Sequence, residues 1–466
     1  MKKKNPFQFL FLVGEGITFA VSGAVIFILI SRVSGPDLLG QYSLAFAWIM
    51  VFQAVGNFGI PEFLMREFGR FEDEENKYFN NGLILGLLSS VAAIPLMIGA
   101  VYISNYDSEL KRALTFGAAV LVPYMVNMIC RGGFMAHKRS ELIFRVAFLE
   151  TALVVSVNAL LVLKGYGIVP LIQTIVLAKI GSSVISLYLF HRHIVPWRWQ
   201  LDVSFCRTLL TPIFTFALSN ILGLVSTRAN IIMLSWLGDL SIVGIYAAAS
   251  KLVEFTLICP SIFAQFMLPQ IARTFAKSPN FELREYRKPF YFMFAASIAL
   301  GLGLIYFAGP VIHLLFGSAF EGSVIVFRVL LVFFMVECLD TMLGVVLKAA
   351  NRQKQDVRLY VVHPALNILL NVILIPAFGG TGAAVARLAG AFSSCALRYV
   401  YVARQLTQFG WLELMVKPLV ICAVLLGSVF LLREQVHFIA LGMMYLASSA
   451  LLLYWAGNAL ERERIG

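Results

Sequence analysis

The residues with the clearest potential for chemistry are charged side chains set deep within apolar stretches long enough to cross a membrane. A charge in the hydrocarbon core costs roughly 2.5–3.5 kcal/mol on insertion scales, so each indicates a binding or coupling site unless a neighbour neutralises it. The deepest candidates are Glu15, Glu150, Lys179, Arg228, Lys251, Glu254, Arg328, Glu337, Asp340 and Arg387.

Two pairs among these candidates have a simple structural explanation. Glu150 and Lys179 each lie about ten residues from the same end of consecutive antiparallel spans, which places them at similar depth, so we expect them to neutralise one another. Lys251 and Glu254 are three residues apart. That spacing brings two side chains together on one helix face, so they could form a local pair.

The remaining acidic candidates leave alternatives open. Glu337 and Asp340 are three residues apart and could together bind a coupling cation. They could equally pair with Arg387 or Arg328. Two further arginines, Arg145 and Arg398, lie within about two turns of the expected inner helix ends and are interpreted as extending to the membrane interface.

Motifs for covalent chemistry are missing from the sequence. The six cysteines are scattered singly without a CxxC spacing, which argues against a disulfide framework or a cysteine metal site. There is no HExxH and no recognisable nucleophile–base arrangement. We therefore expect no catalytic residue, metal or cofactor, and a protein that is not an enzyme.

Composition identifies the elements that must position these charges. Of 466 residues, 60% are hydrophobic and only 13% are charged, whereas soluble chains have about 25% charged residues. Fourteen spans of ~20 residues would need ~280 residues, or about 60% of the chain. The sequence therefore predicts an all-α polytopic membrane protein with about 14 transmembrane helices.

The spans are predicted from apolar runs between charged or Gly/Pro breaks. They fall into a first lobe (1–208), a second lobe (209–405) and a C-terminal pair (406–466). The expected helices are 7–31, 42–60, 80–103, 112–130, 141–163, 169–190, 211–237, 242–268, 289–314, 322–348, 358–376, 382–403, 417–432 and 437–457.

The basic residues orient these spans. Most of the 37 lysines and arginines lie in the tails and in alternate loops, whereas the opposite loops hold Arg32, Lys111, Arg112, Lys164 and Arg433. Because cytoplasmic loops carry the excess of Lys and Arg, both termini are expected in the cytoplasm. The net charge of +12 is explained by this topology, and no nucleic-acid partner is needed.

An internal repeat relates the two lobes. At an offset of 204, Gly40, Tyr42 and Ala45 align with Gly244, Tyr246 and Ala249. A second set aligns at an offset of 213, pairing Arg139, Arg145, Asn158, Gly167 and Tyr188 with Arg352, Arg358, Asn371, Gly380 and Tyr401. Each lobe has six spans, so both enter the membrane in the same direction, and the substrate path is expected between them.

Five short motifs then resemble one transporter family. They are GPDLLGQY at 35–42, VGIYAAA at 243–249, FGSAF at 316–320, KAANRQK at 348–354, and the segment 367–384, in which Asn367, Asn371, Pro376, Gly379, Gly380 and Gly382 match a helix corner. In this order they resemble the polysaccharide-transporter branch of the multidrug/oligosaccharidyl-lipid/polysaccharide (MOP) superfamily, which includes the Wzx-type flippases.

The resemblance implies a V-shaped, MATE-like bundle of two six-helix lobes that opens alternately to each face. It also implies movement of undecaprenyl-linked sugar repeat units to the outer leaflet of the bacterial inner membrane, for O-antigen, exopolysaccharide or capsule assembly. A polysaccharide polymerase or its chain-length machinery would then be a partner. Many such flippases have twelve helices, whereas fourteen are expected here.

In the resembled fold, helices 1, 2, 7 and 8 line the central cavity. Those helices carry Glu15, Gln53, Asn57, Arg228, Lys251 and Glu254. Arg228 and Lys251 each lie about nine residues, or roughly 14 Å, from the outer ends of their helices, which places both near the midplane. We expect these two cations to hold the substrate phosphate, with Gln53 and Asn57 beside the headgroup and Glu15, Glu254, Glu337 or Asp340 as coupling residues.

Two other functions compete. A cation-coupled drug antiporter of the same superfamily would hold cationic substrates with carboxylates, and the expected cavity has two carboxylates beside its two cations. A glycan-assembly enzyme with many spans is disfavoured, because every expected outer loop has about ten residues or fewer.

Overall fold

The computed structural model describes residues 8–68, 74–194, 202–277 and 286–406, together with a few single positions between 416 and 451. Its described residues form helices and turns, with no strand among them. The chain divides into two compact units, Met1–Gly244 and Ile245–Gly466. The predicted all-helical fold is confirmed. The expected lobes 1–208 and 209–405 were defined by the internal repeat and not by contacts, so their boundaries remain a prediction.

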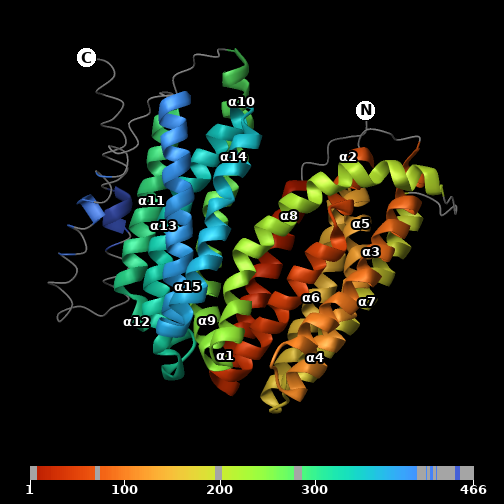
Figure 1. The fold of residues 1–466 in the computed structure, drawn as a ribbon, viewed down its shortest axis with the longest axis horizontal. Coiled ribbons are helices and arrows are strands. Elements are labelled where there is room, and N and C mark those ends of the chain that lie inside the picture. The colour runs from red at the N-terminus through yellow and green to blue at the C-terminus, as the bar shows by residue number, and fades with distance from the viewer. Residues whose placement is uncertain are drawn as a thin grey trace. The chain divides into compact units, whose positions relative to one another are not determined.

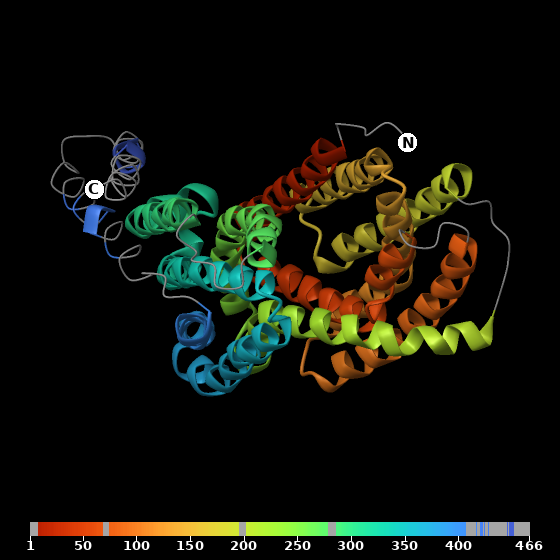
Figure 2. The same cartoon turned by 90° about the horizontal axis from the view of Figure 1, so that it is seen from above.

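The first unit contains eight helices and the start of a ninth (Figure 1). They are α1 (Gln8–Asn57), α2 (Ile60–Phe68), α3 (Glu75–Ile103), α4 (Ser108–Ala118), α5 (Leu121–Ala136), α6 (Ser140–Leu163), α7 (Ile168–His193), α8 (Val203–Leu237) and α9 (Leu240–Thr256). Seen from above, α8 runs along one edge of this unit (Figure 2), where it contacts α1, α2 and α3.

The second unit continues α9 and adds the later helices. They are α10 (Ile258–Lys277), α11 (Arg287–Tyr306), α12 (Ala308–Leu315), the 3₁₀ turn η3 (Ser318–Phe320), α13 (Gly322–Ala349), α14 (Gln353–Tyr360) and α15 (Val362–Gln405). α13 packs along α10, α11 and α15 and forms the centre of this unit.

Length and hydropathy support the predicted spans. The described residues contain nine helices long and apolar enough to cross a membrane, and two of these, Leu10–Asn57 and Gln353–Gln405, have 48 and 53 residues. A single crossing needs only about 20 residues, so each of these two has the length for two crossings. The expected spans 417–432 and 437–457 lie almost entirely outside the described residues, and the total of fourteen stays a prediction.

Glycine makes the corner inside each of these two long helices. Gly35 has φ +77° and Gly379 has φ +53°, which are backbone conformations that side chains with a Cβ atom rarely adopt. Pro36 follows the first corner, at the start of the next helix, where its fixed φ is tolerated. The helix corner expected around Gly379 is confirmed, and at Gly35 a sharp bend takes the place of the expected outer loop.

A second pair of glycines lets two helices touch through their backbones. A Cβ atom on Gly40 would lie 1.9 Å from the carbonyl oxygen of Leu240, and one on Gly244 would lie 2.0 Å from that of Pro36. The contact is reciprocal, because the offset of 204 that relates Gly40 to Gly244 also relates Pro36 to Leu240. This crossing within the first unit therefore joins equivalent positions of the internal repeat.

Replacing Gly40 with alanine should destabilise the protein by about 1–3 kcal/mol, because the added methyl group would overlap backbone atoms that have no rotamer to change. The measurement is thermal unfolding of the purified protein in detergent. Gly16→Ala is the matched control, since Gly16 lies in the same helix with no atom within 4 Å of its missing Cβ. Equal unfolding temperatures for the two variants would contradict a packing role for the crossing.

Candidate functional site

Two ion pairs neutralise deep charges in the first unit. Lys179 of α7 pairs with Glu150 of α6, which confirms the predicted neutralisation. Glu15 of α1 pairs with Arg131 of α5. The predicted spans 112–130 and 141–163 place Arg131 in the loop between them, and this boundary is wrong, because α5 extends to Ala136. Glu15 is therefore a carboxylate held by a cation, and not an isolated acid.

Three of the four residues expected to hold the headgroup, Arg228, Gln53 and Asn57, lie on two helices of the first unit that contact one another. Arg228 is half-buried on α8, and Gln53 is half-buried on α1. Asn57, at the end of α1, is buried, and its Oδ1 atom has no hydrogen-bond partner among the described residues. An unsatisfied buried acceptor of this kind is suited to a hydroxyl group or a water molecule.

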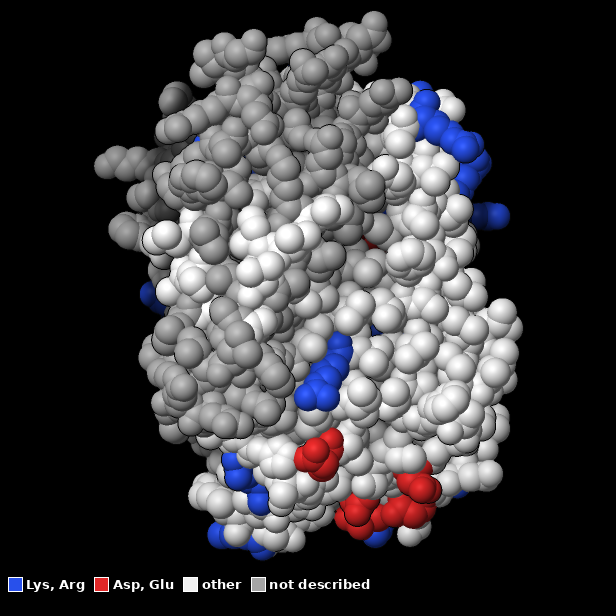
Figure 3. Space-filling view, turned by 90° about the vertical axis from the view of Figure 1, so that its left-hand side faces the viewer, with Lys and Arg blue, Asp and Glu red and all other residues white. Residues whose placement is uncertain are grey.

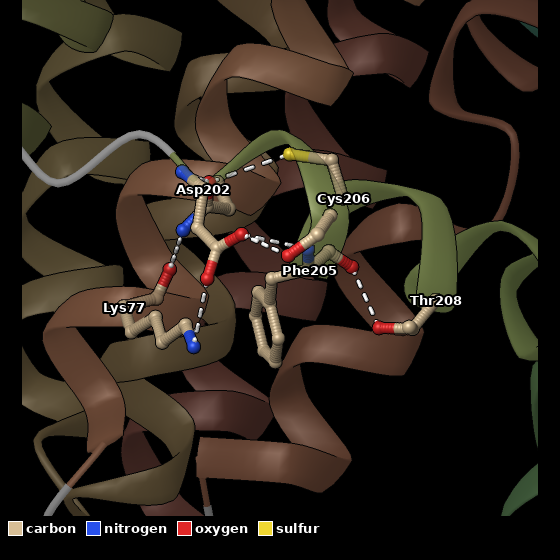
Figure 4. Close-up of polar contacts among 7 residues, drawn as sticks. Lys77, Asp202, Phe205, Cys206 and Thr208 are labelled. Atoms are coloured by element: carbon tan, nitrogen blue, oxygen red, sulfur yellow. Dashed lines mark hydrogen bonds and ion pairs between the residues drawn. The ribbon is translucent and has the colours of Figure 1, made fainter.

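The start of α8 is attached to α3 by polar contacts (Figure 4). Lys77 of α3 lies 3.1 Å from the Asp202 carboxylate, and the backbone N–H of Asp202 donates to Asn81 Oδ1 at 2.9 Å. Donation from the Ser204 hydroxyl and the Phe205 backbone N–H, together with Lys77, holds the pKa of Asp202 well below its usual range. The Asp202 carboxylate is therefore charged at neutral pH, and its ion pair with Lys77 weakens only as the pH falls below the usual range for an aspartate. It fixes the helix that carries Arg228.

The second unit contains Lys251 and its local partner. The Lys251 ammonium lies 3.5 Å from Glu254 on the same helix face, which confirms the pairing expected from their spacing. Arg228 and Lys251 belong to different units. The expectation that the two cations face one substrate therefore remains a prediction.

A buried arginine crosslinks the helices of the second unit. Arg398 of α15 lies 2.5 Å from Asp340 of α13 and 2.6 Å from Asp356 of α14, and all three side chains are at most 7% exposed. The interpretation of Arg398 as extending to the interface is therefore wrong. The two carboxylates neutralise the arginine inside the bundle, so its charge does not have to reach the interface. Lys348 lies 3.8 Å from Asp356 and completes a charge-balanced set of four.

The other charged residues of α13 and α15 have separate surroundings. Arg387 is buried over the Phe333 ring at 4.3 Å and donates to the Ser250 hydroxyl at 3.4 Å. Glu337 lies within electrostatic range of Arg387, consistent with one of the two pairings left open. Arg328 is exposed and donates to the carbonyl oxygen of Ile305 at 3.3 Å. The partner of Asp340 is thus Arg398, and neither of the two arginines considered from the sequence.

The surface of the molecule agrees with a membrane environment. Figure 3 shows a face whose described surface is mostly uncharged: most of its charged side chains lie toward the lower edge and at the upper right, with one basic side chain nearer the middle. Among the described residues no group of three or more His, Cys, Asp or Glu side chains is arranged to hold a metal ion.

Replacing Arg398 with alanine should cost about 3–5 kcal/mol of stability, because two buried carboxylates would lose the cation between them. Arg328→Ala, which removes an exposed arginine on α13, is the control and should leave stability nearly unchanged. Thermal unfolding in detergent compares the two. A small effect at both positions would show that the buried set is not needed for folding.

Comparison with known proteins gives the family. Residues 9–275 match the model of a family described as polysaccharide biosynthesis protein, which is more than half of the chain. A "Probable flippase AglR" of Haloferax volcanii is 23% identical over 394 residues, covering 80% of this chain and 78% of that protein. A second protein of that organism, "Probable low-salt glycan biosynthesis flippase Agl15", is 27% identical over 195 residues, covering 40% of each chain.

Solved structures share the fold. The lipid II flippase MurJ in an inward closed conformation superposes with a TM-score of 0.77 at 13% identity, covering 98% of this chain and 100% of that one. An inward-facing MATE transporter of the MOP superfamily gives a TM-score of 0.65 at 15% identity, covering 82% and 92%. The match to the family model and this shared fold agree with the resemblance seen in the motifs. The chain therefore belongs to the polysaccharide biosynthesis protein family, and it has the fold of the MurJ and MATE transporters.

Proposed function

We propose that this protein is a flippase for oligosaccharide repeat units linked to undecaprenyl phosphate or pyrophosphate. The observation that carries the proposal is the similarity to the protein named "Probable flippase AglR" along 394 residues. That similarity extends well beyond one motif and lies in a chain whose family is named for polysaccharide biosynthesis. The unit would move from the cytoplasmic to the outer leaflet by alternating access, for assembly of O-antigen, exopolysaccharide or capsule. No covalent step is required.

The physical problem for such a transporter is the charged headgroup. A multiply charged phosphate cannot cross hydrocarbon without a polar, cationic path. In this proposal Arg228 binds the phosphate through its planar guanidinium, Lys251 adds a second charge, and Gln53 and Asn57 bind hydroxyl groups. The half-buried position of Arg228 on α8, and the free acceptor of Asn57 on the adjoining α1, support these roles.

In this proposal the protein lies in a bacterial inner membrane with both termini in the cytoplasm. The unequal distribution of lysine and arginine between the two sets of loops supports it. A cation-coupled drug antiporter is the second candidate, favoured by the similarity of fold to the MATE transporter. Glycan export and drug resistance in a strain lacking the gene distinguish the two functions.

Removing Arg228 and Lys251, the side chains proposed to bind the phosphate, should abolish export. A charge-assisted hydrogen bond contributes about 1.5–3 kcal/mol, so Arg228→Ala should weaken headgroup binding by roughly 10- to 150-fold. Arg228→Lys should be milder but measurable, since it keeps the charge and loses the planar fork. The measurement is surface glycan in a deletion strain, with the amount of each variant in the membrane determined.

Lys164→Ala is the matched control, because Lys164 is an exposed cation of the first unit at the end of α6. It should support normal export. Normal export by an Arg228→Ala, Lys251→Ala double variant at wild-type abundance would remove both residues from the proposed path.

Energy coupling is proposed for Glu15, with Glu254, Glu337 and Asp340 as further candidates. The contact between Glu15 and Arg131 gives the first of these a physical basis, because neutralising Glu15 would release the cation of α5. Glu15→Gln should therefore reduce transport that is driven by a proton or sodium gradient. The measurement is flipping in vesicles with and without an imposed gradient. Unchanged acceleration by the gradient would leave Glu15 with a structural role alone.

A further inference from the structure

An ordered aromatic cluster joins three elements of the first unit. Trp48 of α1 donates from Nε1 to the Tyr106 hydroxyl at 3.2 Å, in the turn between α3 and α4. That hydroxyl lies 2.8 Å from Ser235 Oγ, near the end of α8. The next residue, Trp236, donates from Nε1 to Ser104 Oγ at 3.1 Å. Both indole N–H groups are thus hydrogen-bonded to protein.

The two indoles also pack against each other. The ring centroids of Trp48 and Trp236 lie 6.2 Å apart with the planes at 65°, and Phe52 is stacked on Trp48 at 5.8 Å. Trp48 is buried at 3% exposure, whereas Trp236 is 55% exposed. The buried ring and the hydrogen bond to Ser104 together fix the orientation of the exposed ring.

This orientation differs from that of a membrane-anchoring tryptophan. In interfacial belts the ring lies in the apolar layer and its polar edge meets water or lipid headgroups. The polar edge of Trp236 instead meets Ser104 of its own chain, so what is exposed is an apolar aromatic surface held in one orientation. Such a surface suits a rigid ligand with its own apolar face and costs little entropy on binding.

A sugar ring is a ligand of this kind, since its axial C–H groups make one face apolar while its hydroxyls point outward around the rim. We propose that Trp236, supported by Trp48, is a stacking platform for a carbohydrate ring of the transported glycan. This inference rests on the proposed flippase function and adds a glycan-binding subsite to it. Trp236 lies eight residues after Arg228 on α8, or about 12 Å along the helix axis. A phosphate at Arg228 would therefore place a nearby part of the glycan at the level of Trp236 along the helix.

The test compares binding of two lipids to the purified full-length protein in detergent. One probe is the undecaprenyl-linked oligosaccharide extracted from the producing cells, and the other is undecaprenyl pyrophosphate without sugar. Wild-type protein should bind the glycan-bearing lipid more tightly. Trp236→Ala should weaken binding of that lipid by roughly 2- to 10-fold and leave the sugar-free lipid unchanged. Trp236→Phe, which keeps a smaller ring, should have an intermediate effect.

Tyr102→Ala is the matched control, because Tyr102 is 58% exposed near the end of α3 and outside the cluster. It should bind both lipids as the wild type does. An equal loss for both lipids in Trp236→Ala would identify the ring as a membrane anchor or packing element and overturn the platform. Unchanged binding of both lipids by Trp236→Ala would overturn it as well. Failure of the wild type to bind either lipid would instead contradict the proposed function.

Discussion

The structure depends on one constraint, that a charge inside an apolar bundle must have a partner. The described residues meet it in several ways: across two helices in Glu150–Lys179 and Glu15–Arg131, along one helix in Lys251–Glu254, and through a shared arginine in the set around Arg398. A lone charge would cost several kcal/mol, so each pair that joins two helices also fixes which helices lie together. Several of the charged residues that the sequence suggests as binding or coupling sites therefore have a structural role in packing the helices together.

Glycine meets the complementary constraint on packing. Lipid tails are as apolar as leucine, so helices in a membrane gain little from hiding apolar surface and gain instead from close contact. Gly40 and Gly244 allow the closest contact possible, with each glycine against the carbonyl group four residues before the other. The reciprocity of this contact gives physical meaning to the repeat that relates the two sequence segments. Because neither glycine has a side chain at the crossing, the two helices can make the same backbone contact with one another.

Local patterns predicted the features that depend on nearby residues. Hydropathy indicated the spans, Gly379 indicated a helix corner, and spacing or depth indicated the pairs Lys251–Glu254 and Glu150–Lys179. Arg131 was misplaced because the predicted span ended just before it, and Arg398 because its distance from a helix end was taken as the deciding factor. Their carboxylate partners lie 116 and 58 residues away in the chain. The aromatic cluster was also missed because its members are far apart in the sequence. Trp48 and Ser235 are joined through Tyr106, which lies in a turn.

The contacts also separate what holds the first unit together from what is available to a substrate. The attachment of Asp202 to α3 and the hydrogen bonds of Ser235 and Trp236 fix α8 near both ends. Arg228 and the Trp236 ring are thus presented by one positioned helix. If Arg228 binds the phosphate headgroup and Trp236 binds a sugar ring, one helix would recognise both parts of the lipid-linked glycan. Such an arrangement would discriminate against the bare lipid and against free sugar.

The most direct test of this account is transbilayer movement of the lipid-linked oligosaccharide in proteoliposomes that contain only the purified protein. A membrane-impermeant glycosidase added outside digests the glycan in the outer leaflet. The account predicts that the protein will expose the inner-leaflet half to digestion, while protein-free liposomes keep that half protected. Equal protection with and without active, correctly folded protein would contradict the assignment as a flippase.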